Sequence, residues 1–84
     1  MMNVSAQVSL YPLGQSDLAP AIEAVLSVFA EHDLLYEVGP MSTVVSGDDE
    51  RLFMALREAF AQATELGGAV MTVTISNACP VDPR

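Results

Sequence analysis

The segment Asn3-Val-Ser-Ala-Gln-Val-Ser-Leu-Tyr11 decides the fold prediction, because apolar and small polar side chains alternate along its length. Its apolar positions are Val4, Ala6, Val8 and Leu10, and the positions between them are Ser5, Gln7, Ser9 and Tyr11. A period of two over four repeats is typical of a β-strand with one face on a core. Pro12 ends the predicted strand, since proline has no N–H to donate to a sheet.

An amphipathic helix is predicted next, after a loop at residues 13–16. Asp17 is the expected N-cap, and Pro20 fits the first helical turn. The spacing i, i+3, i+4 and i+7 of one helical face is filled by Ile22, Val25, Leu26 and Phe29. We expect the helix to end near His32 and Asp33, where the glycine that usually closes a helix is missing.

Two short strands and a second helix are predicted in the middle of the chain. Residues 34–38 and 41–46 are strand candidates on either side of a Gly39-Pro40 turn, a pattern typical of an antiparallel hairpin. Ser46 and Asp49 match the capping-box pattern at the start of the second helix. Its predicted apolar stripe comprises Leu52, Phe53, Leu56, Ala59, Phe60 and Ala63. Gly67-Gly68 is expected to end this helix.

The last predicted strand covers residues 70–76, with Met71, Val73 and Ile75 alternating with Thr72, Thr74 and Ser76. The element order is then β-α-β-β-α-β. Because both crossovers must be right-handed, this order predicts an α+β, ferredoxin-like fold: a four-stranded antiparallel sheet of order 4-1-3-2 with two helices on one face. We expect residues 1–84 to form a single domain, with 77–84 as a loose tail.

Composition excludes several classes of partner. The chain has 84 residues, 11 of them acidic and 3 basic, for a formal net charge of −8. Binding to nucleic acid or to an anionic membrane needs clustered Lys and Arg, which this chain lacks. Hydrophobic residues make up 51% of the chain, too many for a disordered protein. So many apolar residues in one small domain indicate burial against a partner, and we expect a homo-oligomer.

The N-terminal residues include no basic leader of the kind that begins a signal peptide, and no apolar stretch approaches the about 20 residues that span a bilayer. Cys79 is the single cysteine, so neither an internal disulfide nor a cysteine-pair metal site is possible within one chain. We therefore expect a soluble, cytoplasmic protein.

Side chains for conventional catalysis are sparse. His32 lies at a predicted helix end beside acidic residues, where a partner of the helix dipole is more common than a general base. Cys79 lies in the predicted tail without an organised base. Asp48, Asp49 and Glu50 point in different directions at a helix start, and the dipole there explains them without a cation. We predict a protein that is not an enzyme, with no metal and no cofactor.

The sheet face opposite the helices is the candidate functional surface. It is predicted to carry the polar residues of the first strand together with Thr72 and Thr74, and one of Val44 and Val45 must also point outward. Small hydroxyls among apolar groups suit a small-molecule pocket. An ordinary solvated sheet face and a protein–protein contact remain alternatives. Met41 and Glu37 lie near the hairpin turn, where Glu37 could reach a cationic ligand or simply protect an edge strand.

Two stretches resemble the small thiamine-binding protein family, namely Val8-Ser-Leu-Tyr-Pro-Leu-Gly14 and Tyr36-Glu-Val-Gly-Pro-Met-Ser-Thr-Val-Val-Ser-Gly47. The resemblance covers residues 3–76 and implies a ferredoxin-like fold assembled as a homodimer or homotetramer. It also implies non-catalytic binding of thiamine (vitamin B1) or its hydroxymethylpyrimidine moiety. The matching positions implied to bind ligand are Ser9, Tyr11, Glu37, Gly39, Met41 and Thr43, and Thr72 is added from its predicted place on the open face.

An acidic chain is electrostatically suited to this ligand, because thiamine is a cation and a net charge of −8 raises its local concentration. The competing hypothesis is an assembly or regulatory subunit that uses the open sheet face for protein–protein contact. The two hypotheses differ in one observable, since only the first predicts a response to a small molecule alone.

Overall fold

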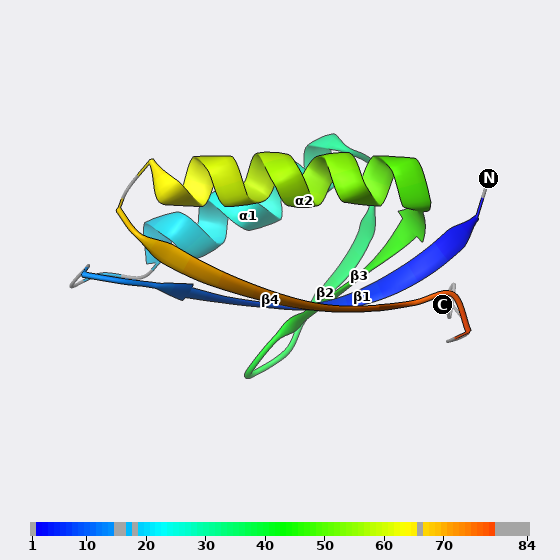
Figure 1. Ribbon diagram of the computed structural model, residues 1–84, viewed down its shortest axis with the longest axis horizontal. Helices are drawn as coiled ribbons and strands as arrows, with labels where there is room; N and C mark the ends of the chain where they lie inside the picture. The colour runs from blue at the N-terminus through cyan, green and yellow to red at the C-terminus, as the bar shows by residue number, and fades with distance from the viewer. Residues whose placement is uncertain (1, 15–16, 18, 66, 79–84) are drawn as a thin grey trace.

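The computed structural model describes residues 2–14, 17, 19–65 and 67–78. Its elements are β1 (Asn3–Pro12), α1 (Ala19–Glu31), β2 (Leu35–Val38), β3 (Thr43–Asp48), α2 (Asp49–Thr64) and β4 (Ala69–Ser76). The strands form one antiparallel sheet of order β2-β3-β1-β4, and both helices cover the same face of it (Figure 1). This is the predicted order read from the other edge, so the ferredoxin-like α+β fold is confirmed.

The register of the sheet settles which residues face the helices. Ala6 of β1 is paired with Val45 on one side and with Ile75 on the other, so these three share the helix-facing side. Val45 is completely buried there. Val44 is paired with Gln7 and lies on the open face, 46% exposed. The pairing of β3 with β1 thus shows that Val44, and not Val45, points to the open face, which the alternation of residues alone did not determine.

The core lies between the sheet and the two helices. Its largest fully buried side chains are Phe29, Leu52, Val28 and Val45. In α1 the buried residues are Ala21, Val25, Val28 and Phe29, so the predicted stripe is rotated: Ile22 is 39% exposed and Leu26 only half-buried. Ala21, which the predicted stripe left out, is completely buried.

The apolar stripe predicted for α2 is wrong at both phenylalanines. The residues that α2 buries are Leu52, Ala55, Leu56, Ala59 and Ala63. Phe53 and Phe60 are 56% and 40% exposed. Three of these five buried residues are alanines, and neither phenylalanine shares their side of the helix. The two rings therefore lie on the flank of the helix.

Both helices have side-chain or backbone caps at their ends. Asp17 accepts a hydrogen bond through Oδ1 from the Ala19 N–H (3.1 Å), consistent with its predicted capping role. At the other end of α1, Asp33 has a φ of 55°, and the Leu34 N–H donates to the Phe29 carbonyl. This is a Schellman closure with aspartate in the left-handed position usually taken by glycine.

The start of α2 differs from the capping-box prediction. β3 continues to Asp48, two residues beyond its predicted end, because Asp48 still pairs with Asn3. Asp48 is therefore the N-cap, and its Oδ2 accepts from the Arg51 N–H (3.3 Å). Ser46 instead lies in the strand, with its hydroxyl 3.1 Å from that of Ser5.

The end of β1 also differs slightly from its predicted end, because strand pairing continues further than expected. Pro12 is the last residue of β1, opposite Ala69, because a strand end can include a residue that does not donate. Of the predicted tail, residues 79–84, with Cys79, lie outside the described residues. Neither α1 nor α2 is long and apolar enough to cross a membrane.

Candidate functional site

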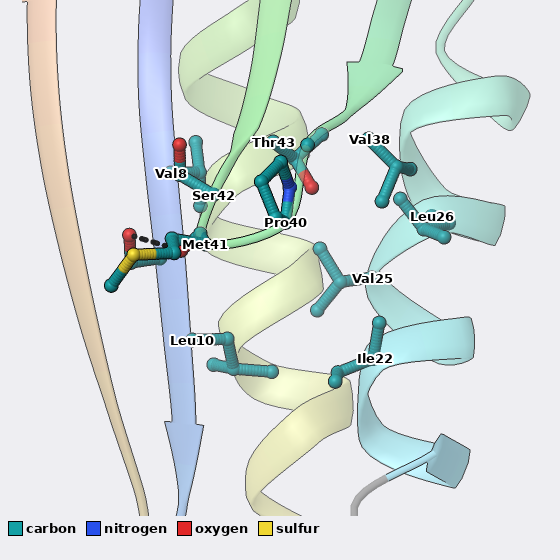
Figure 2. Close-up of a pocket in the computed structure, with 12 residues that line it drawn as sticks. Val8, Leu10, Ile22, Val25, Leu26, Val38, Pro40, Met41, Ser42 and Thr43 are labelled. Carbon is teal, nitrogen blue, oxygen red and sulfur yellow. Dashed lines mark hydrogen bonds between the residues drawn. The ribbon is translucent and has the colours of Figure 1, made fainter.

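A groove of about 220 Å³ opens between α1 and the loop that joins β2 to β3 (Figure 2). One wall comes from α1, the opposite wall from the end of β1, and the rim from the loop. The lining residues are Val8, Ser9, Leu10, Ile22, Val25, Leu26, Val38, Gly39, Pro40, Met41, Ser42 and Thr43. The groove therefore lies on the helix side of the sheet, and not on the open face where we expected a pocket.

The loop is held in place by hydrogen bonds to itself and to β1. Pairing of β2 with β3 ends at Val38 and Thr43, which leaves residues 39–42 as the connection. The Gly39 N–H donates to the Ser42 carbonyl (2.8 Å). A Cβ at position 39 would lie 3.0 Å from that same oxygen, so glycine allows this close turn.

Two side chains of β1 form hydrogen bonds with the second half of the loop, residues 41 and 42. The Ser9 hydroxyl donates to the Met41 carbonyl (3.3 Å), and the Gln7 Nε2 donates to the Ser42 hydroxyl (3.1 Å). Pro40 further restricts the backbone, because its ring fixes φ. The rim is thus preformed by local hydrogen bonds, while the Met41 side chain remains 85% exposed.

The chemistry of the groove is apolar walls with a few polar groups at the rim. Ile22, Val25 and Leu26 supply the wall from α1, and the Thr43 hydroxyl lies opposite it. The Ser42 hydroxyl is bonded by Gln7, whose side chain lies on the open face of the sheet. None of the twelve lining residues is charged. Drug-sized ligand pockets measure about 300–1,000 Å³, so this groove suits one small ring with hydrogen-bonding substituents better than a larger molecule.

The structure divides the sequence-predicted site residues into two groups. Ser9, Gly39, Met41 and Thr43 line the groove. Tyr11, Glu37 and Thr72 do not line it: in the register of the sheet, all three lie on the open face. Ser9 connects the groups, because it is opposite Thr72 in the sheet while its hydroxyl bonds the groove loop.

The α1 wall is the part of the groove that sequence reasoning missed. Ile22 and Leu26 were assigned to the core, although α1 has more apolar positions than one buried face requires. This surplus of apolar residues could have indicated that α1 also lines a groove. Leu10 and Val38 were assigned to strands, and nothing in their sequence context indicates that they border a common space with α1.

The polar residues that we considered for catalysis have structural partners. His32 Nε2 lies 2.6 Å from Glu58 Oε2, and Gln62 Nε2 donates to Glu58 Oε1 (3.3 Å). This cluster joins the end of α1 to the outer part of α2, away from the groove-lining residues. The Asp49 carboxylate accepts from the Met2 N–H (3.3 Å). No group of three metal-binding side chains occurs within the described residues.

The architecture defines a class of protein: a ferredoxin-like α+β domain with a small apolar groove at its β-hairpin. Its likeness to a de novo designed protein with a ferredoxin fold supports the fold (TM-score 0.70, 13% identity, 100% of this chain and 91% of the other). The sequence model of the YKOF-related family matches residues 3–82. The chain therefore belongs to the YKOF-related family.

Two known proteins are similar to this chain over much of its length. UPF0045 protein MJ1052 of Methanocaldococcus jannaschii is 35% identical over 60 residues, and the match spans 70% of this chain and 60% of that relative. Its crystal structure has a TM-score of 0.86 at 27% identity, covering 100% of this chain and 89% of the other. A Thermotoga maritima protein, TM0486, has a TM-score of 0.77 at 21% identity, covering 87% and 81%. Its description assigns it provisionally to thiamine biosynthesis or salvage.

Proposed function

We propose that this protein binds thiamine, or its hydroxymethylpyrimidine moiety, without converting it, and that the groove at the β-hairpin holds the pyrimidine ring. The observation that carries the proposal is the groove itself: apolar walls, a polar rim and a volume of about 220 Å³ that suits one substituted ring. The thiamine-related description of TM0486, a protein of the same fold, is consistent with this ligand class.

The pyrimidine ring matches the groove chemically. Its flat faces are apolar enough to pack against Ile22 and Leu26. Its amino group and ring nitrogens need acceptors and donors, which the Thr43 hydroxyl and the loop backbone supply. A preformed rim lowers the entropic cost of binding, because few groups must be ordered.

The thiazolium part carries the positive charge and would extend from the groove towards solvent. None of the lining residues is basic, and the chain has a net charge of −8, so the field at the mouth favours a cation. Glu37 lies one residue before Val38 of the rim but on the open face of the sheet. We therefore assign it a contribution to this field and no direct contact with the ring.

The alternative, an assembly or regulatory subunit that uses the open sheet face, is favoured by one observation. Leu35 and Val44 are 61% and 46% exposed on that face, beside the hydroxyl-bearing residues of β1. Under this alternative the protein gives no response to a small molecule, and substitutions of Val44 abolish contact with a partner.

The test is isothermal titration calorimetry and thermal melting with thiamine and with hydroxymethylpyrimidine. We expect both ligands to raise the melting temperature, and Ser9→Ala combined with Thr43→Val to reduce the shift. Thr43→Val alone removes one hydroxyl and should weaken binding about 2- to 10-fold, the effect of losing a hydrogen bond worth about 0.5–1.5 kcal/mol. Thr74→Val on the open face is the matched control and should bind normally.

A second variant tests the place of the site. Ile22→Trp puts an indole into the groove at a residue that is already 39% exposed, and we expect it to abolish binding while the fold is retained. Ser27→Trp places the same side chain on an exposed position of the same helix outside the groove. Absence of heat and of a thermal shift at millimolar ligand would disprove the proposal, as would equal binding by both tryptophan variants.

A further inference from the structure

No basic side chain lines the groove in the described part of the chain. The sequence has three basic residues, and two of them, Arg51 and Arg57, belong to α2, which contributes no residue to the groove. The third, Arg84, lies outside the described residues. Sites that hold a phosphate group commonly supply arginine or lysine to it, so the side chains of this groove are not suited to a phosphate.

The start of α1, next to the groove, offers little to an anion through its backbone. Free N–H groups at a helix N-terminus often bind phosphates. Ile22 of the groove wall follows Ala19, the first residue of α1, by three residues, or about 4.5 Å along the helix axis. The Ala19 N–H already donates to Oδ1 of Asp17 (3.1 Å), and Pro20 has no N–H. Two of the first N–H groups are therefore not available to a ligand.

The Asp17 carboxylate also puts a negative charge at this end of the groove. A carboxylate is stabilised at a helix N-terminus by the helix dipole. Here it occupies the place that the anionic part of a ligand would take, at the first residue of a helix whose fourth residue lines the groove. A second anion at this end would be repelled by it.

The loop at residues 39–42 has few free donors as well. The Gly39 N–H donates to the Ser42 carbonyl (2.8 Å), and Pro40 has no N–H. A phosphate-binding loop turns several successive N–H groups towards the anion. This loop cannot do so over its first two residues, so the rim of the groove resembles the start of α1 in this respect.

We propose that the groove distinguishes ligands by phosphorylation: it binds hydroxymethylpyrimidine and thiamine and rejects their phosphate esters. This inference rests on the proposed function, because it concerns the ligand of the same site. A phosphate ester carries about 1.5 to 2 negative charges at pH 7. A chain with a net charge of −8 repels it, and we assign to Asp17 the local part of this repulsion.

The free alcohol meets no such obstacle. A hydroxymethyl group is neutral, and the Thr43 hydroxyl, which lies opposite the α1 wall, can donate to it or accept from it. An anion without a partner in an apolar groove loses its hydration and receives nothing in exchange. The same walls that suit the pyrimidine ring therefore favour its unphosphorylated form.

This preference gives the protein a place between two classes of reaction. The free alcohol is supplied by hydrolysis of a phosphate ester, in which water replaces the alcohol on phosphorus. It is consumed by phosphoryl transfer, in which its oxygen attacks the terminal phosphorus of a nucleoside triphosphate, the nucleoside diphosphate leaves and the hydroxyl proton passes to a base. Another protein catalyses each step. Because the ester is rejected, the product of the second step does not return to the groove.

The test is calorimetric titration of the full chain with hydroxymethylpyrimidine and with its phosphate ester. At an ionic strength of about 0.01 M we expect the ester to bind roughly 10-fold more weakly or not at all. At about 1 M the gap should narrow, because the Debye length falls from about 30 Å to about 3 Å. Thiamine and thiamine monophosphate should differ in the same direction but less, since that phosphate lies on the side of the molecule that extends towards solvent.

Two exposed alanines of α1 provide matched variants. Ala19→Lys puts a cation at the end of the helix beside the groove, and Ala30→Lys puts the same cation eleven residues away, about 16 Å along the axis. Both change the net charge equally. We expect Ala19→Lys to tighten binding of the ester roughly 5-fold relative to the alcohol and Ala30→Lys to leave that ratio unchanged. Circular dichroism checks that both variants fold, and the wild-type titrations decide the proposal if one does not.

The outcomes separate this proposal from the proposed function. An ester that binds the wild type as tightly as the alcohol overturns the specificity and leaves ligand binding in place. Absence of heat with every ligand disproves the proposed function, and this inference with it. Equal gains for the two lysine variants would overturn the role of Asp17, because they would show that the total charge and not the local field excludes the ester.

Discussion

The molecule consists of two strand–helix–strand halves, β1–α1–β2 and β3–α2–β4, whose helices cover the same face of the sheet. Each half leaves apolar side chains exposed beside a sheet edge. In the first half they are Ile22 of α1 and Val38 of β2, and the loop at 39–42 makes their surroundings concave. In the second half they are Phe60 of α2 and Val73 of β4, the strand at the sheet edge.

The difference teaches that exposed apolar surface alone does not identify a partner. A concave surface with a preformed polar rim can enclose a small ring, whereas a straight strand edge with free backbone groups fits another strand. The groove for which we propose a ligand therefore belongs to the first half, and the exposed apolar side chains of the second half lie outside it.

The largest expected effect is on stability, and it distinguishes Phe29 in the first half from Phe60 in the second. Phe29 of α1 is completely buried, and Phe29→Ala should reduce the free energy of unfolding by about 3–5 kcal/mol. Phe60→Ala in α2 should cost far less, because that ring is already 40% exposed. Urea unfolding at two protein concentrations measures both effects. Equal losses for the two variants, independent of concentration, would contradict this distinction between the halves.

The next largest effect on stability is expected from removing the N-cap residues of the two helices. Asp48→Ala should destabilise the protein by about 1 kcal/mol, because the Arg51 N–H loses its acceptor. The loss should lie towards the lower end of the range for N-caps, since the buried Oδ1 of Asp48 has no hydrogen-bond partner within the described residues. Asp48→Ser keeps an acceptor and serves as the control.

Asp17→Ala extends this test to α1, where the first turn of the helix contains no acidic residue. Thermal melts of the two alanine variants compare the caps directly. A larger loss for Asp17→Ala than for Asp48→Ala would show that the better-capped helix is α1.

How much of this could be predicted depends on how local each feature is. The strands and helices follow from residue periodicity, so the element order and the sheet order were correct. Which side of α2 is buried was not, because Phe53 and Phe60 lie close enough to Leu56 around the helix to fit the same stripe. The structure decides between the two orientations, because it buries Ala55, Ala59 and Ala63 and leaves the two phenylalanines exposed.

The candidate site was predictable in part for the same reason. Gly39 and Met41 of the loop and Thr43 at the start of β3 belong to one continuous motif, and all three line the groove. The α1 wall is brought to them only by tertiary packing, with Ile22 and Thr43 far apart in the chain. Alternation placed Tyr11 and Thr72 on one face, but it could not indicate that the groove lies on the other.

The smallest expected effect concerns the ends of the two helices. Asp33 closes α1 with a φ of 55°, a conformation that costs most residues free energy and glycine none, whereas Glu65 closes α2 with an ordinary φ of −66°. Asp33→Gly should stabilise the protein by about 0.5 kcal/mol. The substitution relieves the backbone strain at this position, but part of that gain is lost because glycine has more conformational entropy in the unfolded chain. Glu65→Gly relieves no strain and adds only the entropic cost, so it should destabilise the protein. Chemical denaturation of both variants measures the difference, and the same sign of change for both would show that the left-handed turn after α1 is not strained.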